Sequence, residues 1–124
     1  MFRTVLTTLA AVLLATSITA TAQPKPALKA ADGTLTNAAG MTLYVFDKDA
    51  GGKSACNGPC AANWPPLMVV GDATGSGDWT IVVRDDGGKQ WAYKGKPLYQ
   101  WSKDAKPGDK TGDGINSIWH VAKD

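Results

Sequence analysis

Two cysteines, four residues apart, are the most reactive side chains in the sequence. Cys56 and Cys60 stand in CNGPC and are the only cysteines. In an exported protein two nearby thiols normally form a disulfide, and closing so short a loop stabilises a fold by about 2 kcal/mol on the chain-entropy model. Redox motifs favour two intervening residues rather than three, and thiolates also bind metals. We predict a structural disulfide, with redox and metal chemistry as alternatives.

A metal site would have to recruit His120, the only histidine. Soft sulfur and imidazole ligands suit copper. Nothing in the sequence brings His120 to the cysteines, and strand alternation puts it on the face opposite Trp119. We therefore assign no metal or cofactor. The candidates for a copper-type site are Cys56, Cys60 and His120, with Met41 and Met68 as further soft ligands.

The aspartates offer carboxylates but select no catalytic pair. DAKPGDKTGDG places Asp104, Asp109 and Asp113 within ten residues, which suggests calcium. The segment lacks the alternate-residue ligands and final Glu of an EF-hand, and aspartates that cap turns explain it as well. No nucleophile-elbow pattern accompanies the single histidine, and scattered aspartates define no glycosidase pair. We predict that the protein is not an enzyme.

The first residues predict export. MFRT and the apolar run VLTTLAAVLLATSITATA are typical of a signal peptide, and Ala20-Thr21-Ala22 fits a cleavage site. We expect residues 1–22 to be the signal, Gln23 to begin the mature chain, and no transmembrane segment to remain. The protein should then be periplasmic or secreted. The formal net charge of only +2 argues against electrostatically driven binding to nucleic acid.

The elements that must position these residues read as strands and turns. Residues 33–49 predict strand, turn and strand, residues 59–63 a single helical turn, and residues 64–70 a strand that begins with prolines. Residues 79–101 predict a hairpin around Asp86-Gly87 and then a third strand. The segment INSIWHVA closes the chain as a last strand. We predict an all-β fold with no long amphipathic helix.

One offset of 55 residues relates the two halves of the chain. It joins Tyr44 to Tyr99, Asp49 to Asp104 and Trp64 to Trp119. Residues 33–64 thus align with residues 88–119 without a gap, which indicates an internal duplication. We predict that residues 23–124 form one compact antiparallel sandwich or small barrel, built from two pseudo-symmetric repeats of about 55 residues.

The strongest likeness between the repeats is a Tyr-x-(Phe/Trp)-x-x-Asp motif. Alternation along a strand puts the tyrosine and the next aromatic on one face, and the intervening apolar residues on the other. We expect a core strand covered on both sides, followed by an aspartate that accepts backbone N–H groups of the exit turn. The motif residues are Tyr44, Phe46 and Asp49 in the first repeat and Tyr99, Trp101 and Asp104 in the second.

Residues 33–122 resemble a bacterial family of secreted repeats, described as predicted lipoproteins with a conserved Tyr-x-(Phe/Trp/Tyr)-x-x-Asp motif. The resemblance rests on that motif, on Cys-x-x-x-Cys and on Trp64-Pro65-Pro66. It implies an exported β-repeat module and no particular reaction. The sequence departs from the lipoprotein pattern because its first cysteine is Cys56, well past the expected cleavage point.

These observations predict an exported, non-enzymatic β-repeat module that binds a partner or small ligand at the cell envelope. The alternative is a periplasmic copper-type metal protein or thiol-redox protein that uses Cys56 and Cys60, with His120 as a possible ligand.

Overall fold

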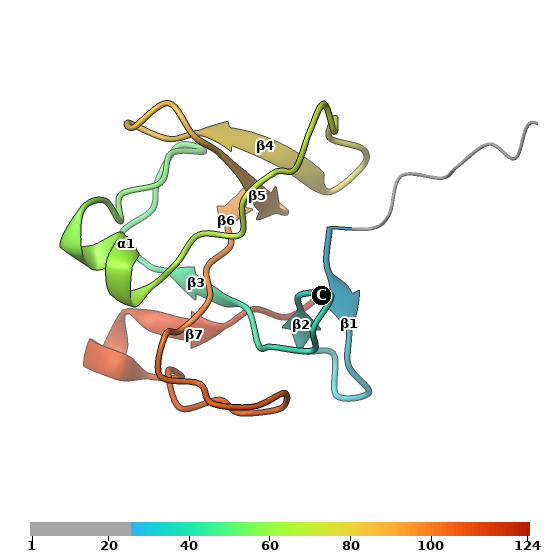
Figure 1. The fold of residues 1–124 in the computed structure, drawn as a ribbon, viewed down its shortest axis with the longest axis vertical. Helices are drawn as coiled ribbons and strands as arrows, with labels where there is room; N and C mark the ends of the chain where they lie inside the picture. The colour runs from blue at the N-terminus through green and yellow to red at the C-terminus, as the bar shows by residue number, and fades with distance from the viewer. Residues whose placement is uncertain (1–25) are drawn as a thin grey trace, which may run out of the picture.

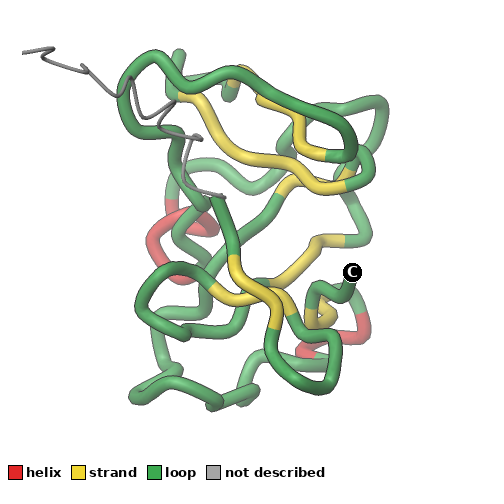
Figure 2. Tube along the Cα trace, turned by 90° about the vertical axis from the view of Figure 1, so that its right-hand side faces the viewer, coloured by secondary structure: helices red, strands yellow, loops and turns green. Residues whose placement is uncertain are grey.

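The computed structural model describes residues 26–124. Short strands joined by long loops make up most of this part of the chain (Figures 1 and 2). The elements, in chain order, are β1 (Leu28–Lys29), β2 (Leu35–Thr36), β3 (Tyr44–Phe46), α1 (Pro59–Asn63), β4 (Trp79–Val83), β5 (Lys89–Tyr93), β6 (Lys96–Pro97), the 3-10 helix η1 (Ile115–Ser117) and β7 (Trp119–Val121).

All strand pairs are antiparallel, which confirms the predicted fold class. β1 pairs with β2, β3 pairs with β7, and β4, β5 and β6 form a three-stranded sheet in that order. Isolated bridges add further residues to these sheets, including Tyr99 beside Tyr44 of β3 and Met68 beside Gln90 of β5. Within residues 26–124 the strands do not close into a barrel, so the barrel alternative is wrong.

Each repeat is completed by the last strand of the other repeat. β7, from the second repeat, pairs with β3 of the first, and the two lie side by side in Figure 1. In the reverse direction Leu67 accepts the backbone N–H of Trp91 at 2.8 Å and donates its own to Leu98 at 2.9 Å. The two repeats therefore exchange strands and form one body.

Tyr44 and Tyr99 lie on the pseudo-twofold axis that relates the repeats. The N–H of Tyr44 donates to the carbonyl of Tyr99 at 2.8 Å, and the N–H of Tyr99 donates to the carbonyl of Tyr44 at 2.9 Å. The two motif segments thus meet at equivalent residues, so a contact that a motif side chain makes across this axis can have a counterpart in the other repeat.

Both motif segments are covered on both faces, as their alternation predicts. Only the first is a regular strand, β3, because β6 ends at Pro97, before Tyr99 and Trp101. Leu43 and Leu98 are buried in one cluster, against which Val45, Trp79 and Tyr93 pack. Tyr44 and Tyr99 are buried in the other cluster, which is mainly aromatic. The remaining members of the aromatic cluster are Cys56, Trp64 and Trp119, with Phe46, Cys60, Trp101, Ile115, Ile118 and Val121 partly buried around them.

The local elements follow the predicted turn chemistry. Asp86-Gly87 turns β4 into β5, with Gly87 at a φ of 84° and the N–H of Gly88 donating to the Asp86 carboxylate at 2.8 Å. α1 begins at Pro59. Proline suits this position because an N–H in the first turn of a helix would have no intrahelical acceptor.

The predicted signal peptide, residues 1–22, and the expected cleavage before Gln23 lie outside the described residues. Among residues 26–124, no helix has the length and apolar character needed to span a bilayer.

Candidate functional site

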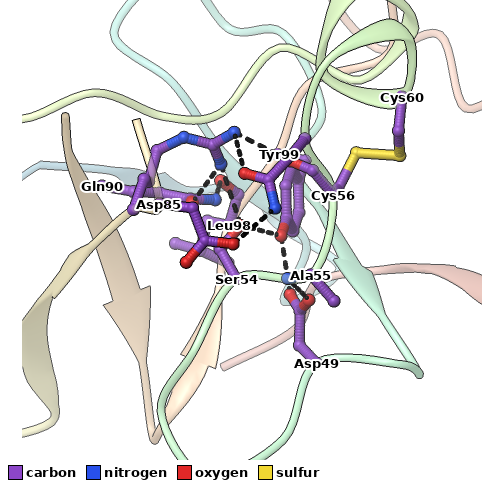
Figure 3. Close-up of a disulfide and its surroundings, with 11 residues drawn as sticks. Asp49, Ser54, Ala55, Cys56, Cys60, Asp85, Gln90, Leu98 and Tyr99 are labelled. Atoms are coloured by element: carbon purple, nitrogen blue, oxygen red, sulfur yellow. Dashed lines mark hydrogen bonds between the residues drawn. A yellow bond between two sulfur atoms is a disulfide. The ribbon is translucent and has the colours of Figure 1, made fainter. Parts of the chain in front are cut away.

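The motif tyrosines and aspartates bond across the two repeats. Tyr44 donates its phenolic proton to Asp104 at 2.6 Å, and Tyr99 donates to Asp49 at 2.8 Å. Figure 3 shows the second of these pairs, with Tyr99 pointing down onto Asp49. Both tyrosines are fully buried. The motif is therefore a pair of crossed hydrogen bonds that holds one repeat to the other.

Each aspartate uses its second oxygen for the turn that follows it. Asp49 accepts the N–H of Ala55 at 2.7 Å. Asp104 accepts the N–H of Thr111 at 3.0 Å and its hydroxyl at 2.6 Å. One carboxylate thus joins its own exit turn to the tyrosine of the opposite repeat, which a turn cap alone would not do.

Burial is the main cause that raises the pKa of both tyrosines, because the interior disfavours a phenolate. The hydrogen bond donated to Asp104 raises the pKa of Tyr44 further, and the bond to Asp49 does the same for Tyr99. Both phenols are protonated at neutral pH. They act as donors to the carboxylates, and they are not poised as acids or bases.

Four aromatic rings form a stacked column through the aromatic cluster. Its order is Phe46, Trp119, Trp64, Trp101, with centroid separations of 4.1, 3.8 and 4.0 Å. The second aromatic residue of each motif thus stacks on a tryptophan of the other repeat: Phe46 on Trp119, and Trp101 on Trp64. Tyr44 meets Trp64 edge-on at 5.4 Å, and Tyr99 meets Trp119 edge-on at 5.2 Å. The column has the same pseudo-symmetry as the crossed hydrogen bonds.

Arg84 is buried beside the Tyr99–Asp49 pair, and the sequence analysis missed it. The guanidinium donates to Ser54 at 2.8 Å and to Gln90 at 2.9 Å. It also donates to the carbonyl of Cys56 at 2.7 Å. A signal was available, since Arg84 and Arg3 are the only arginines among thirteen basic residues, and a rigid five-donor fork suits a buried site better than lysine does.

Ser54 links this arginine to the motif. Its hydroxyl lies 2.5 Å from the hydroxyl of Tyr99. Because the Tyr99 hydroxyl donates its one proton to Asp49, Ser54 must donate to Tyr99 while it accepts from Arg84. The cation, two hydroxyls and the carboxylate form one polar chain through the first half of the interface.

A disulfide joins Cys56, on the loop that leads into α1, to Cys60 in the first turn of α1 (Figure 3). Cys56 is fully buried, and Arg84 holds its carbonyl. Neither sulfur is a thiolate ligand in this state. Among residues 26–124, no group of three or more His, Cys, Asp or Glu side chains could hold a metal ion.

The three aspartates considered for calcium each accept a backbone N–H group. Asp109 accepts the N–H groups of Ala105 and Lys106 at 2.9 and 3.1 Å. Asp113 accepts the N–H of Val121 at 3.1 Å. Asp104 is engaged by Tyr44 and Thr111, so donors of the fold itself bond to all three carboxylates.

His120 lies on the outer side of β7, in a cleft between β3, β7 and the β5–β6 turn. Its Nε2 is 2.7 Å from the carboxylate of Asp47, and both side chains are about half exposed. The cleft has a volume of about 370 Å³. We call it the lysine cleft; its lining includes Val45, Asp47, Tyr93, Lys94, Lys96, Leu98, His120 and Lys123.

The free energy of unfolding should depend on pH through Asp49. Burial raises the pKa of its carboxyl above the ordinary 3.8, against the hydrogen bonds from Ala55 and Tyr99, which lower it. A carboxyl with a raised pKa holds its proton more tightly in the folded protein. Its contribution is therefore complete below about pH 3.8 and is lost as the pH rises through the folded pKa.

Urea melts of the wild type and Asp49→Asn between about pH 3.5 and 6.5 measure this contribution. The stability difference, wild type minus variant, should fall as the pH rises. Asp32 and Asp124, whose pKa values are lowered by Lys110 and Lys29, remain in both proteins and cancel. A difference that grows with pH would contradict the assigned burial of Asp49.

Comparison with protein families gives one match. A model of a family described as a secreted repeat of unknown function matches residues 27–68 and 80–123, one repeat in each segment. Neither the curated proteins nor the solved structures include a match to this chain.

Proposed function

Because the chain belongs to this family of secreted repeats of unknown function, we propose that it is an exported module that binds a ligand or partner at the cell envelope through the lysine cleft. Three exposed lysines, Lys94, Lys96 and Lys123, surround the cleft. Exposed ammonium groups around a concave surface favour an anionic partner.

The motif side chains are engaged in contacts inside the fold. Tyr44 and Tyr99 are fully buried and bond to Asp104 and Asp49, while Phe46 and Trp101 stack on the tryptophans. These residues hold the repeats together, which leaves the outer surface of the same segments for binding.

The observation that carries the proposal is the difference between the two halves of the duplication. The 55-residue offset places Met41 opposite Lys96, Pro65 opposite His120, and Ser102 opposite Asp47 in the other repeat. Met41, Pro65 and Ser102 line a smaller hollow of about 100 Å³. The same backbone therefore folds without the charged residues, which supports a role for them beyond folding.

The smaller hollow also supplies conservative replacements for a test. Lys96→Met and Lys123→Met each introduce the residue found 55 positions earlier, at Met41 and Met68. Immobilised wild type and double variant would be incubated with native envelope extract, and the retained molecules identified by mass spectrometry. Lys89→Met, an exposed lysine of β5 that is absent from the cleft lining, is the matched control.

We expect the wild type and Lys89→Met to retain the same ligand, and the double variant to lose it without a change in its urea midpoint. Equal retention by all three proteins, or no specific retention by any, would overturn the proposal.

A further inference from the structure

We infer that the ligand of the lysine cleft is a small amphiphilic anion, with one carboxylate or phosphate head and an apolar tail. This inference rests on the proposed function and specifies its ligand. It follows from the size of the cleft, its apolar wall, its lysines that form no salt bridge and one strained residue at its rim.

The cleft has the size of a small-molecule site. Its volume of about 370 Å³ falls within the range of about 300–1,000 Å³ that is usual for such pockets. A concave site of this size encloses a short chain, whereas a protein partner normally needs a flatter and larger contact surface.

Apolar side chains form one wall of the cleft. Val45 and Tyr93 line it, and both are only half buried where they pack against the Leu43–Leu98 cluster. Part of their apolar surface is therefore exposed in the cleft. Covering it with a hydrocarbon tail removes this surface from water, which favours binding in proportion to the area covered.

The charges around this wall favour an anion. Asp47 is the only acid in the lining, and it is bonded to His120. The nearby Asp124 is held by Lys29 at 2.7 Å. Within residues 26–124, Lys94, Lys96 and Lys123 make no salt bridge. Three ammonium groups thus surround the apolar wall, and no carboxylate of the cleft forms a salt bridge with them.

Lys94 is kept in a backbone conformation that lysine disfavours. The two-residue turn between β5 and β6 is Lys94-Gly95, with φ values of 49° and 80°. A turn with two positive φ angles favours Asn-Gly, because most side chains with a Cβ are strained there. Lys94 also places its Nζ 5.3 Å from the centroid of Tyr93. A strained residue at the rim of a cleft is consistent with a ligand-binding role.

Lys94→Asn separates binding from folding. Asparagine suits the turn, so the variant should melt at a temperature equal to or above that of the wild type. Losing one exposed cation should weaken binding of an anionic probe by about two- to fivefold. Lys94→Asn combined with Lys96→Met and Lys123→Met should weaken it by about tenfold or more. A purely structural role for Lys94 would show no loss of affinity.

Titration calorimetry with four probes below their micelle-forming concentrations tests the ligand class. Decyl phosphate and decanoate should bind. Inorganic phosphate, which has the charge without the tail, and decyl maltoside, which has the tail without the charge, should bind at least about tenfold more weakly. Vesicles of phosphatidylglycerol form a fifth arm, which separates a free small anion from a membrane surface.

Each opposing outcome overturns the inference in a distinct way. Equal binding of inorganic phosphate removes the role of the apolar wall, and equal binding of decyl maltoside removes the role of the lysines. Binding to the vesicles alone replaces the small ligand with a lipid surface. If no probe binds, the inference fails, and retention of an envelope ligand that depends on Lys96 and Lys123 decides whether the proposed function survives.

Discussion

Trp64→Ala is expected to lower the free energy of unfolding by about 3–5 kcal/mol, the usual cost of deleting a large buried aromatic side chain. Trp64 is 5% exposed and stands inside the four-ring column. Its loss removes two stacked contacts, with Trp119 and Trp101, and one edge-on contact with Tyr44. The pseudo-symmetric variant Trp119→Ala should cost a similar amount.

Urea melts followed by far-UV circular dichroism measure this effect. Trp79→Ala is the control, because Trp79 is also an aromatic in contact with other rings but lies half buried outside the column. Trp64→Phe keeps a ring in the column and should recover part of the loss if Trp64→Ala does not fold. A cost for Trp64→Ala no greater than that of Trp79→Ala would show that the column does not hold the repeats together.

Arg84→Met is expected to lower the free energy of unfolding by about 2–4 kcal/mol. The substitution removes the donors from several buried acceptors, and each buried acceptor left without a partner costs about 1–3 kcal/mol. The acceptors that lose Arg84 include Ser54, Gln90 and the carbonyl of Cys56. Methionine fills much of the same space, so a missing side-chain volume would not explain the loss.

Two further variants define the cause. Arg84→Lys keeps the charge but lacks the planar fork, so it should recover little of the loss. Lys89→Met removes an exposed cation from the neighbouring strand and should change stability by less than about 0.5 kcal/mol. A fully stable Arg84→Met protein would show that the loop of the disulfide does not depend on this residue.

The local features of the fold could be predicted because they depend on neighbouring residues. Alternation along the motif strand correctly separated Leu43 from Tyr44 into two clusters, since side chains in a strand point to opposite faces in turn. The hairpin at Asp86-Gly87 follows from turn chemistry, and so does the bond from Ala55 to Asp49.

The contacts between repeats could not be predicted in the same way. Tyr44 and Asp104 are 60 residues apart, and the duplication shows that the two halves are alike without showing how they meet. From the sequence alone, the backbone N–H groups of the exit turn are sufficient partners for the aspartate of each motif. The exchange of the last strands creates these long-range pairs.

The candidate site was missed for a related reason. The sequence placed His120 away from Trp119, but the cleft needs Asp47 from the first repeat and Lys94 from the hairpin of the second. The differences between the repeats do indicate the site. Lys96, His120 and Asp47 stand where the other copy has Met41, Pro65 and Ser102.

The central claim is that the motif joins the repeats by crossed hydrogen bonds, and double-mutant cycles test it most directly. The substitutions are Tyr44→Phe, Tyr99→Phe, Asp49→Ala and Asp104→Ala, singly and in pairs, with the free energy of unfolding measured in urea. We predict coupling of about 1.5–3 kcal/mol for Tyr44 with Asp104 and for Tyr99 with Asp49, as expected of hydrogen bonds to charged groups. The same-repeat pairs, Tyr44 with Asp49 and Tyr99 with Asp104, should be additive within about 0.5 kcal/mol. Coupling within each repeat and additivity across the repeats would contradict the account.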